Sequence, residues 1–191
     1  MTGDGITPQP TMRTAALSTA TLWKPAYIGL GSNLDEPRQQ IAMAFEQLAK
    51  LADCRLFARS RLYASKPLGP QDQPDFINAA AGMLTVLDVH ALLAGLQDIE
   101  RSMGKQSPQQ RWGARRIDLD LLVFGNEVHD EPSLRVPHPG VSTRNFVLYP
   151  LLDIAPELSI PGQGRVAKLA ARVGSDGIAP LDSLTGSLLP R

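Results

Sequence analysis

Two aspartates, Asp118 and Asp120, alternate with apolar residues in the run IDLDLLVF over residues 117–124. The alternation predicts a β-strand, in which both carboxylates point to one face about 6.6 Å apart, because each residue adds about 3.3 Å. Ionised carboxylates this close repel each other unless a cation lies between them. Mg²⁺ binds through one or two carboxylates and takes its remaining oxygens from water and substrate phosphates. The pair therefore indicates a site for two Mg²⁺ ions.

Three arginines directly precede this strand: Arg111, Arg115 and Arg116, in the stretch RWGARR. A D-x-D motif alone is short and common, and for such a motif we expect simple pairing of the aspartates with these arginines. The glycines and the proline of residues 104–116, however, favour a loop. Guanidinium groups match phosphate oxygens, and a loop can deliver them after a substrate binds. Together, carboxylates for Mg²⁺ and arginines for phosphate indicate phosphoryl transfer.

Trp112 lies among these arginines, where its indole could fill the core or cover a planar ligand. The sequence lacks the G-x-x-x-x-G-K-[ST] loop, and GLGSNL (residues 29–34) lacks the third glycine of a dinucleotide fingerprint. Gly31 is therefore first a turn residue, suited to close approach of the backbone to a ligand. A nucleotide enzyme with these motifs belongs to another class.

The elements that must position these residues alternate in type along the chain. We expect strands over residues 26–30, 54–64, 76–86 and 116–125, helices over 37–51 and 88–103, and a proline-rich loop over 65–75. The order βαββαβ predicts an α+β, ferredoxin-like core with an antiparallel four-stranded sheet and both helices on one face. We expect the other face to stay open for a ligand, roofed by the proline-rich loop and residues 104–116.

The second helix aims a carboxylate at the core. At 100° per residue, Glu100 falls within the apolar stripe and Gln97 at its edge. A structural arginine partner or a solvated helix edge is the usual explanation, and contact with a ligand or loop is the alternative.

Composition excludes several classes of protein. Lys plus Arg and Asp plus Glu both number 19, so no overall field attracts nucleic acid or a membrane surface. The single cysteine, Cys54, excludes an intramolecular disulfide. No apolar run approaches the roughly 20 residues of a membrane-spanning helix, and the first residues lack a signal-peptide pattern. We expect a cytoplasmic monomer that binds small molecules.

Composition also divides the chain. Residues 1–22, rich in small and polar residues, predict a disordered extension. Residues 23–162 predict one domain, and residues 163–191 a short helix, VAKLAARV, with a tail.

Five motifs stand in a fixed order: GLGSNL (29–34), KPLGPQDQPDFINA (66–79), RWGARRIDLDLLVFG (111–125), VPHPG (136–140) and RNFVLYPL (144–151). Together they closely resemble the 6-hydroxymethyl-7,8-dihydropterin pyrophosphokinases of folate biosynthesis. The resemblance implies a ferredoxin-like fold and Mg²⁺-dependent transfer of the β,γ-diphosphate of ATP, the co-substrate, to the hydroxymethyl group of a dihydropterin, releasing AMP.

The same resemblance implies roles for individual residues. Asp118 and Asp120 would hold two Mg²⁺ ions on the ATP phosphates, and Arg115 and Lys105 would be catalytic. The implied ATP-binding residues are Gln97, Glu100, Arg111, His138 and Arg144. The implied pterin-binding residues are Ser65, Leu68, Phe76, Asn78, Trp112 and Phe146. Among these, Asn78 would bind the amide-and-amine edge of the ring, and the tryptophan and Phe146 would sandwich it; core aromatics and a capping asparagine are the alternatives.

Three positions depart from the family pattern. Lys105 and Ser107 stand where many members carry arginine, and Lys66 where some carry proline. Lysine cannot form the two-pronged arginine contact. We therefore expect the chemistry to persist but loop closure over ATP to be altered.

Two other functions compete with this interpretation. A ferredoxin-like fold can present aromatics to RNA, but zero net charge and an acidic D-x-D on the binding face disfavour it. An enzyme that transfers a single phosphoryl group would fit the charged motifs but leave the pterin-site pattern unexplained.

Overall fold

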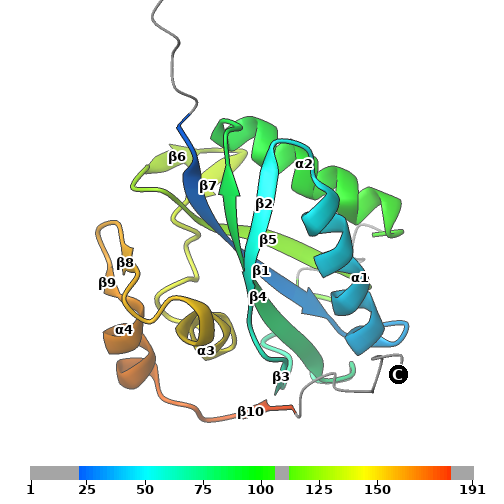
Figure 1. The fold of residues 1–191 in the computed structure, drawn as a ribbon. Coiled ribbons are helices and arrows are strands. Elements are labelled where there is room, and N and C mark those ends of the chain that lie inside the picture. The colour runs from blue at the N-terminus through cyan, green and yellow to red at the C-terminus, as the bar shows by residue number, and fades with distance from the viewer. Residues whose placement is uncertain (1–21, 106–111, 182–191) are drawn as a thin grey trace, which may run out of the picture.

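The computed structural model describes residues 22–105 and 112–181. Figure 1 shows one central sheet with helices on both of its faces. The elements are, in chain order, β1 (Lys24–Ser32), α1 (Pro37–Lys50), β2 (Cys54–Arg59), β3 (Tyr63–Ser65), β4 (Phe76–Thr85), α2 (Val89–Ser102), β5 (Asp118–Phe124), β6 (His129–Glu131), β7 (Leu134–Val136), α3 (Asn145–Ile154), β8 (Ser159–Ile160), β9 (Gly164–Arg165), α4 (Val166–Val173) and β10 (Ile178–Pro180).

The sheet has the strand order of a ferredoxin-like fold. β1 lies at its centre and pairs antiparallel with β4 on one side and β5 on the other. β2 and β3 both pair antiparallel with β4, and β10 adds to the outer edge of β3. The βαββαβ order and the antiparallel pairing confirm the predicted α+β fold class, although the main sheet of the described residues has six strands rather than four.

The single strand expected over residues 54–64 is wrong, because the pairing with β4 shifts by one residue around Ser60, between the Arg59–Ala81 and Tyr63–Asn78 pairs. The Ser60 amide donates to the Ala80 carbonyl at 2.9 Å, and the Ser60 hydroxyl accepts from the Ala80 amide at 2.8 Å. One residue thus takes both backbone groups of Ala80. β2 ends before this point, and β3 begins after it.

The two faces of the sheet carry separate cores. Alternate residues of β1, such as Ile28, pack under α1 and α2 in the larger core. Ala80 of β4 and Leu122 of β5 belong to the second core, beneath α3 and α4 (Figure 1). The expectation that this second face stays open is therefore wrong for the part that α3 and α4 cover. The pattern does not predict α3, because this helix is short, largely apolar and contains Pro150.

The predicted first and second helices are present. α1 begins at Pro37, whose fixed φ suits a first helical position. α2 begins after Asp88, whose carboxylate accepts from the Ala91 amide at 2.8 Å and so caps the helix. The stretch VAKLAARV forms α4.

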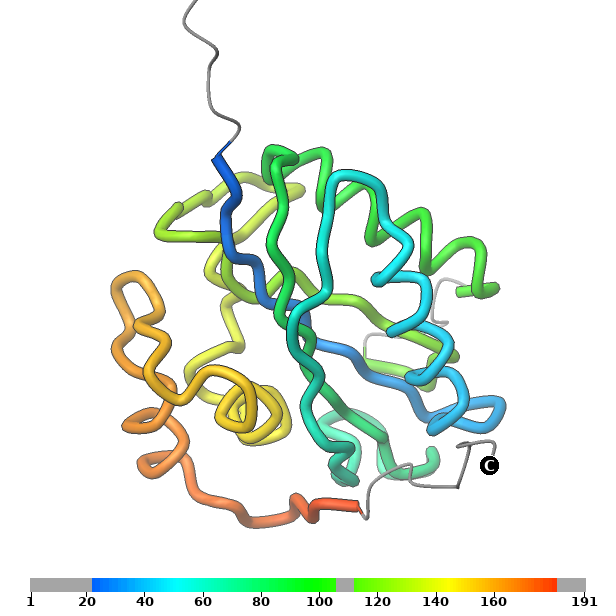
Figure 2. Tube along the Cα trace, viewed as in Figure 1, coloured from blue at the N-terminus to red at the C-terminus, as the bar shows by residue number. Residues whose placement is uncertain are grey.

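The C-terminal part of the described chain wraps around α3. Figure 2 shows the trace passing from the β8–β9 turn through α4 and then beneath α3 to β10, beside β3. Of the extension expected over residues 1–22, only Leu22 lies within the described residues. The expected tail is described up to Leu181.

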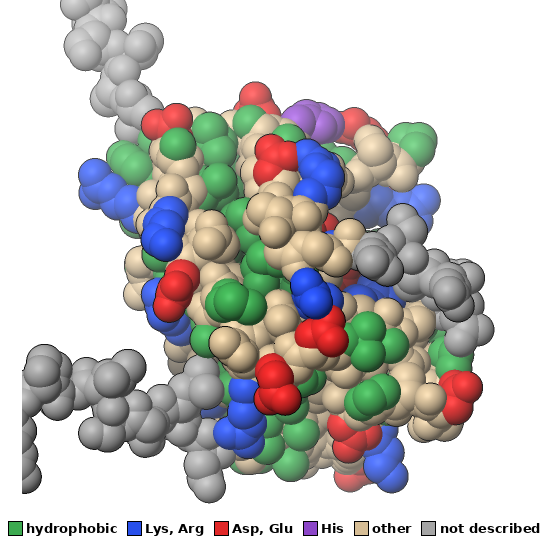
Figure 3. Space-filling model, turned by 90° about the vertical axis from the view of Figure 1, so that its right-hand side faces the viewer, with side chains coloured by type: hydrophobic (Ala, Val, Ile, Leu, Met, Phe, Trp, Pro, Cys, Tyr) green, Lys and Arg blue, Asp and Glu red, His purple; other side chains and the backbone are tan. Residues whose placement is uncertain are grey.

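The surface agrees with a chain of balanced charge. Lys, Arg, Asp and Glu side chains are interspersed on the face shown in Figure 3. Within the described residues, no helix is both long and apolar enough to span a membrane.

Candidate functional site

A cavity, partly open to solvent, lies on the α3 side of the sheet. Its walls come from β1, β3, β4, β5, the proline-rich loop, the residues before β5, and the start of α3. All six residues assigned to the pterin line it: Ser65, Leu68, Phe76, Asn78, Trp112 and Phe146. Four residues assigned to metal, phosphate or nucleotide line it as well: Arg115, Asp118, Asp120 and Arg144.

A row across three strands forms the floor of the cavity. Gly31 of β1 pairs with Asn78 of β4 on one side and with Asp118 of β5 on the other. The expectation that Gly31 is a turn residue is therefore wrong, because β1 continues to Ser32. The two outer residues are thus two strand spacings apart, about 9.6 Å. A Cβ at Gly31 would lie 3.7 Å from the Asn78 Oδ1 atom. Because residue 31 has no side chain, the space between the amide and the carboxylate stays accessible to a ligand.

The amide of Asn78 is held from one side. Its Nδ2 donates to the Ser65 Oγ at 2.9 Å and to the Tyr63 carbonyl at 3.4 Å. The side chain is buried, with the residue only 5% exposed. Since the nitrogen binds β3, the oxygen lies beside the glycine of the floor.

The two aspartates differ in their surroundings. Asp118 accepts from Lys105 Nζ at 2.7 Å through Oδ1 and from Arg115 Nη1 at 2.5 Å through Oδ2. The pKa of Asp120 is raised to about 7, first by burial and then by the charge of Asp118, while Lys105 and Arg115 oppose the shift. Pairing of the aspartates with the arginines therefore holds for Asp118 and Arg115. Arg116 instead pairs with Asp35 at 2.7 Å.

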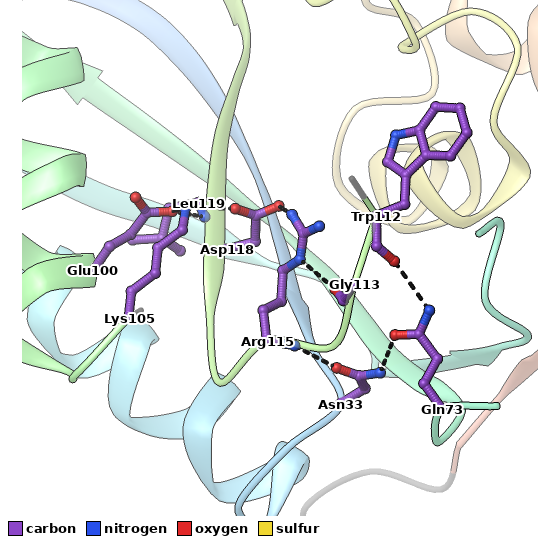
Figure 4. Close-up of polar contacts among 9 residues, drawn as sticks. All are labelled: Asn33, Gln73, Glu100, Lys105, Trp112, Gly113, Arg115, Asp118 and Leu119. Carbon is purple, nitrogen blue, oxygen red and sulfur yellow. Dashed lines mark hydrogen bonds and ion pairs between the residues drawn. The ribbon is translucent and has the colours of Figure 1, made fainter. Parts of the chain in front are cut away.

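Hydrogen bonds within the protein account for the burial of the Glu100 carboxylate. Its Oε1 accepts from Lys105 Nζ and from the Leu119 amide, each at 2.7 Å. Burial raises the pKa of this carboxyl, and both hydrogen bonds oppose the shift. The expected arginine partner is thus a lysine. Because Leu119 separates the two aspartates in sequence, Glu100 fixes the backbone of β5 between them (Figure 4).

Asn33 and Gln73, for which the sequence predicts no role, join the loops around the cavity. Asn33 accepts from the Arg115 amide at 2.8 Å and donates to Gln73 Oε1 at 3.1 Å and to the Pro74 carbonyl at 3.0 Å. Gln73 in turn donates to the Trp112 carbonyl at 3.0 Å. Figure 4 shows this chain of bonds, with the indole pointing away from it. The only sequence signal was the position of both residues within the quoted motifs.

Trp112 adopts a left-handed backbone conformation, with φ of 61°. Its side chain lies over Gly69, where a Cβ would come within 2.8 Å of the tryptophan Cβ. The residue is 45% exposed. A core position for this indole is therefore excluded, and its remaining predicted role is to cover a ligand.

Two of the residues predicted to bind ATP, Arg144 and His138, lie close to each other but differ in their access to the cavity. Arg144 lines the cavity, with its guanidinium 6.0 Å from the centroid of the Phe146 ring. His138 lies behind it, and its Nδ1 accepts from the Gly140 amide at 3.1 Å. Burial and the nearby Arg144 charge lower the pKa of this histidine.

The remaining assigned residues do not line the cavity. His138, Gln97, Glu100 and Lys105 are absent from its walls, although the lysine reaches Asp118. Gln97 is exposed on α2. Arg111 and Ser107 lie outside the described residues.

Comparison with known proteins places this site in a family. The family model described as 7,8-dihydro-6-hydroxymethylpterin-pyrophosphokinase matches residues 27–156. A protein of Pseudomonas aeruginosa named 2-amino-4-hydroxy-6-hydroxymethyldihydropteridine pyrophosphokinase is 46% identical over 155 residues, which cover 81% of this chain and 95% of that protein. A Haemophilus influenzae protein of the same name is 43% identical and is covered to 89%, over 75% of this chain.

The fold is also similar to that of a solved structure, Plasmodium falciparum HPPK-DHPS, with a TM-score of 0.62. The match covers 81% of this chain but only 46% of the other, so this chain spans less than half of that protein. At 14% identity this likeness concerns the fold alone. The family match and the two relatives carry the assignment, and the chain belongs to the 7,8-dihydro-6-hydroxymethylpterin-pyrophosphokinase family.

Proposed function

We propose that the chain transfers the diphosphate of ATP to 6-hydroxymethyl-7,8-dihydropterin in folate biosynthesis, with Mg²⁺, giving AMP and the dihydropterin diphosphate. The floor row of Asn78, Gly31 and Asp118 is the observation that carries the proposal. It sets a group suited to the edge of a pterin on one side of a bare backbone position and a carboxylate suited to metal and phosphate on the other.

The pterin half of the site is apolar with one polar edge. Asn78 would bind the amide-and-amine edge of the ring through its side-chain amide, steadied by Ser65. Trp112 and Phe146 come from opposite segments of the wall, the loop and α3, and would stack on the two ring faces. Leu68 and Phe76 complete the apolar lining. The hydroxymethyl arm then extends over Gly31 towards β5.

The metal half supplies oxygen ligands but no complete cage. Among the described residues, no group of three or more His, Cys, Asp and Glu side chains could hold a metal ion. Asp118 and Asp120 offer two carboxylates on one face, which fits ions that take their other ligands from phosphates and water. We propose that they hold two Mg²⁺ ions together with ATP. Bound there, Mg²⁺ would neutralise phosphate charge and orient the diphosphate.

The transfer exchanges one phosphorus–oxygen bond for another. A bond forms from the hydroxymethyl oxygen to the β-phosphorus, the bond to the oxygen shared with the α-phosphate breaks, and the hydroxyl proton is released. Arg115 lines the cavity and contacts Asp118, so it would bind the phosphates as charge develops. Lys105, which donates to the other oxygen of Asp118, would assist.

The adenosine part of ATP would extend beyond Asp118. Arg144 lies on the cavity wall with His138 behind it, and both would contact the nucleotide. Gln97 and Glu100 on α2 and Arg111 remain proposed nucleotide contacts, and of these Glu100 acts from behind β5. We further propose that the enzyme works as a monomer in the cytoplasm.

The proposal is tested by the nucleotide product. The protein is incubated with Mg²⁺, ATP and 6-hydroxymethyl-7,8-dihydropterin, and the nucleotides are separated. AMP formed in step with the pterin product supports diphosphate transfer. ADP would instead mean transfer of one phosphoryl group, and no turnover would contradict both reactions.

A further inference from the structure

We propose that Asp153, with Arg61 and Tyr63, is a positioning cluster that fixes α3 against β3 and thereby sets the fit of the pterin pocket. The inference rests on the proposed function, since it concerns how tightly the same cavity holds its pterin. None of the three residues lines that cavity.

Both oxygens of Asp153 are used in the cluster. Its Oδ1 accepts from Arg61 Nη2 at 2.6 Å and from the Tyr63 hydroxyl at 2.9 Å. Its Oδ2 accepts from the Arg61 backbone amide and from Arg61 Nε, each at 3.1 Å. Because the Asp153 carboxylate binds both the guanidinium and the backbone amide of Arg61, these bonds fix the orientation of the carboxylate as well as its distance.

The cluster is sheltered on the side facing the protein. The carboxylate side chain of Asp153 is 16% exposed although the Arg61 side chain is 57% exposed, and Tyr63 is 3% exposed. The Tyr63 ring also packs edge-on against Tyr149 of α3, with ring centroids 6.4 Å apart. An exposed ion pair alone would contribute little, but here it covers a buried aromatic contact between the same two elements.

On α3 the cluster is connected to the aromatic wall of the cavity. Asp153 follows Phe146 by seven residues, which is about two helical turns, so both lie on the same side of α3. Without the Asp153 contacts, α3 could shift or rotate against β3, and Phe146, on the same side of the helix, would move with it.

On the sheet the cluster is connected to the polar edge of the cavity. Tyr63 pairs directly with Asn78, and its carbonyl accepts from the Asn78 amide. Ser65, two residues further along β3, points to the same face and accepts from the same amide. Asp153 is therefore linked to both proposed pterin contacts: to Asn78 through Tyr63, and to Phe146 through α3.

β3 needs this support because it has only three residues. β4 pairs with one edge, and β10 covers the other, with Pro180 opposite Tyr63 and the Leu181 amide donating to the Leu62 carbonyl at 2.8 Å. The hydrogen bonds of Asp153 add the link to α3 that the sheet pairing cannot provide.

The test compares pterin affinity with ATP affinity in Asp153→Asn and Tyr63→Phe. We expect the dissociation constant and KM for the dihydropterin to rise about tenfold in Asp153→Asn and less in Tyr63→Phe, because displaced walls weaken stacking and edge contacts. The ATP dissociation constant and kcat should stay within about twofold, since the aspartates of β5 do not contact the cluster.

A matched control is Glu157→Gln, which breaks the exposed 2.8 Å pair between Glu157 and Arg165 away from the cavity and should change neither constant. Circular dichroism melting shows whether each variant is folded, and Tyr63→Phe keeps the ring if Asp153→Asn does not fold. Equal losses for pterin and ATP, or unchanged pterin affinity in both folded variants, would overturn the inference. A wild-type protein that binds no dihydropterin and forms no AMP would overturn the proposed function and the inference with it.

Discussion

The proposed arrangement depends most closely on Gly31. This residue lies between Asn78 and Asp118 in the sheet, and because it has no side chain, the space between them stays open. We expect Gly31→Ala to fold, since the added methyl would make an ordinary 3.7 Å contact with the Asn78 oxygen. The methyl would nonetheless occupy the path of the hydroxymethyl arm, and KM for the pterin should rise at least about tenfold. Steady-state kinetics and thermal melting measure the two effects. Unchanged kinetics in a folded Gly31→Ala variant would show that the ligand does not cross this position.

Substitution of Asp120 should affect the chemical step rather than pterin binding, because this residue is buried beside a second carboxylate, Asp118. We expect Asp120→Asn to lower kcat by about 10²-fold or more, as loss of one charged group at a phosphoryl-transfer site does. Pterin binding without ATP should remain within about twofold, because Asp120 is not among the residues proposed to contact the ring, which lie on β3, β4, α3 and two loops. Titration calorimetry with the pterin alone checks the second part. Retained turnover would contradict the metal assignment.

At the scale of elements, Asn33 joins the segment after β1 to the proline-rich loop and to the segment before β5. Asn33→Ala removes three hydrogen bonds, including those to the Arg115 amide and the Pro74 carbonyl, and each lost bond costs about 0.5–1.5 kcal/mol. We expect lower stability in urea unfolding together with a lower kcat, because Arg115 loses its anchor. Asp35→Asn is the control: its ion pair with Arg116 is exposed and contributes less than about 1 kcal/mol. Equal effects of both variants would argue against a specific role for Asn33.

The link between α3 and β3 should also be visible in the pH dependence of stability. Arg61 and Tyr63 hold the pKa of Asp153 below its ordinary value despite burial. A depressed pKa contributes stability that is present above the unfolded value, near 3.8, and is lost as the pH falls through the folded value. The wild type should therefore exceed Asp153→Asn in stability at pH 7, and the difference should shrink below about pH 4. Urea unfolding at several pH values measures it, and a constant difference would contradict the assignment.

The sequence patterns predict most of the elements but not all of their ends. The strands and helices up to β5 follow from alternation and helical periodicity, and Asp88 marks the start of α2 correctly. The break at Ser60 leaves no signal, because both sides of it read as strand. α3 is missed because a short, largely apolar helix with an internal proline shows little amphipathic period. β10 is missed because its pairing with β3 is set by the path of the chain around α3.

At the scale of the whole molecule, the sheet brings together residues that are far apart in sequence. The pairing of Asp118 and Asp120 on one face follows from alternation, yet the row from Asn78 through Gly31 to Asp118 requires the register of three strands. The family resemblance could supply the residues proposed to bind the pterin, all of which line one cavity. It could not supply the bonds of Asn33 and Gln73, which depend on how two loops meet.

In the proposed reaction, the β- and γ-phosphates of ATP move together as one group. ATP labelled with ³²P at the β-position distinguishes the two possible transfers directly. We expect the label to appear in the pterin product, with unlabelled AMP released, because attack at the β-phosphorus carries both outer phosphates away. Label that stays with the nucleotide as ADP, while a label at the γ-position moves to the pterin, would contradict the claim.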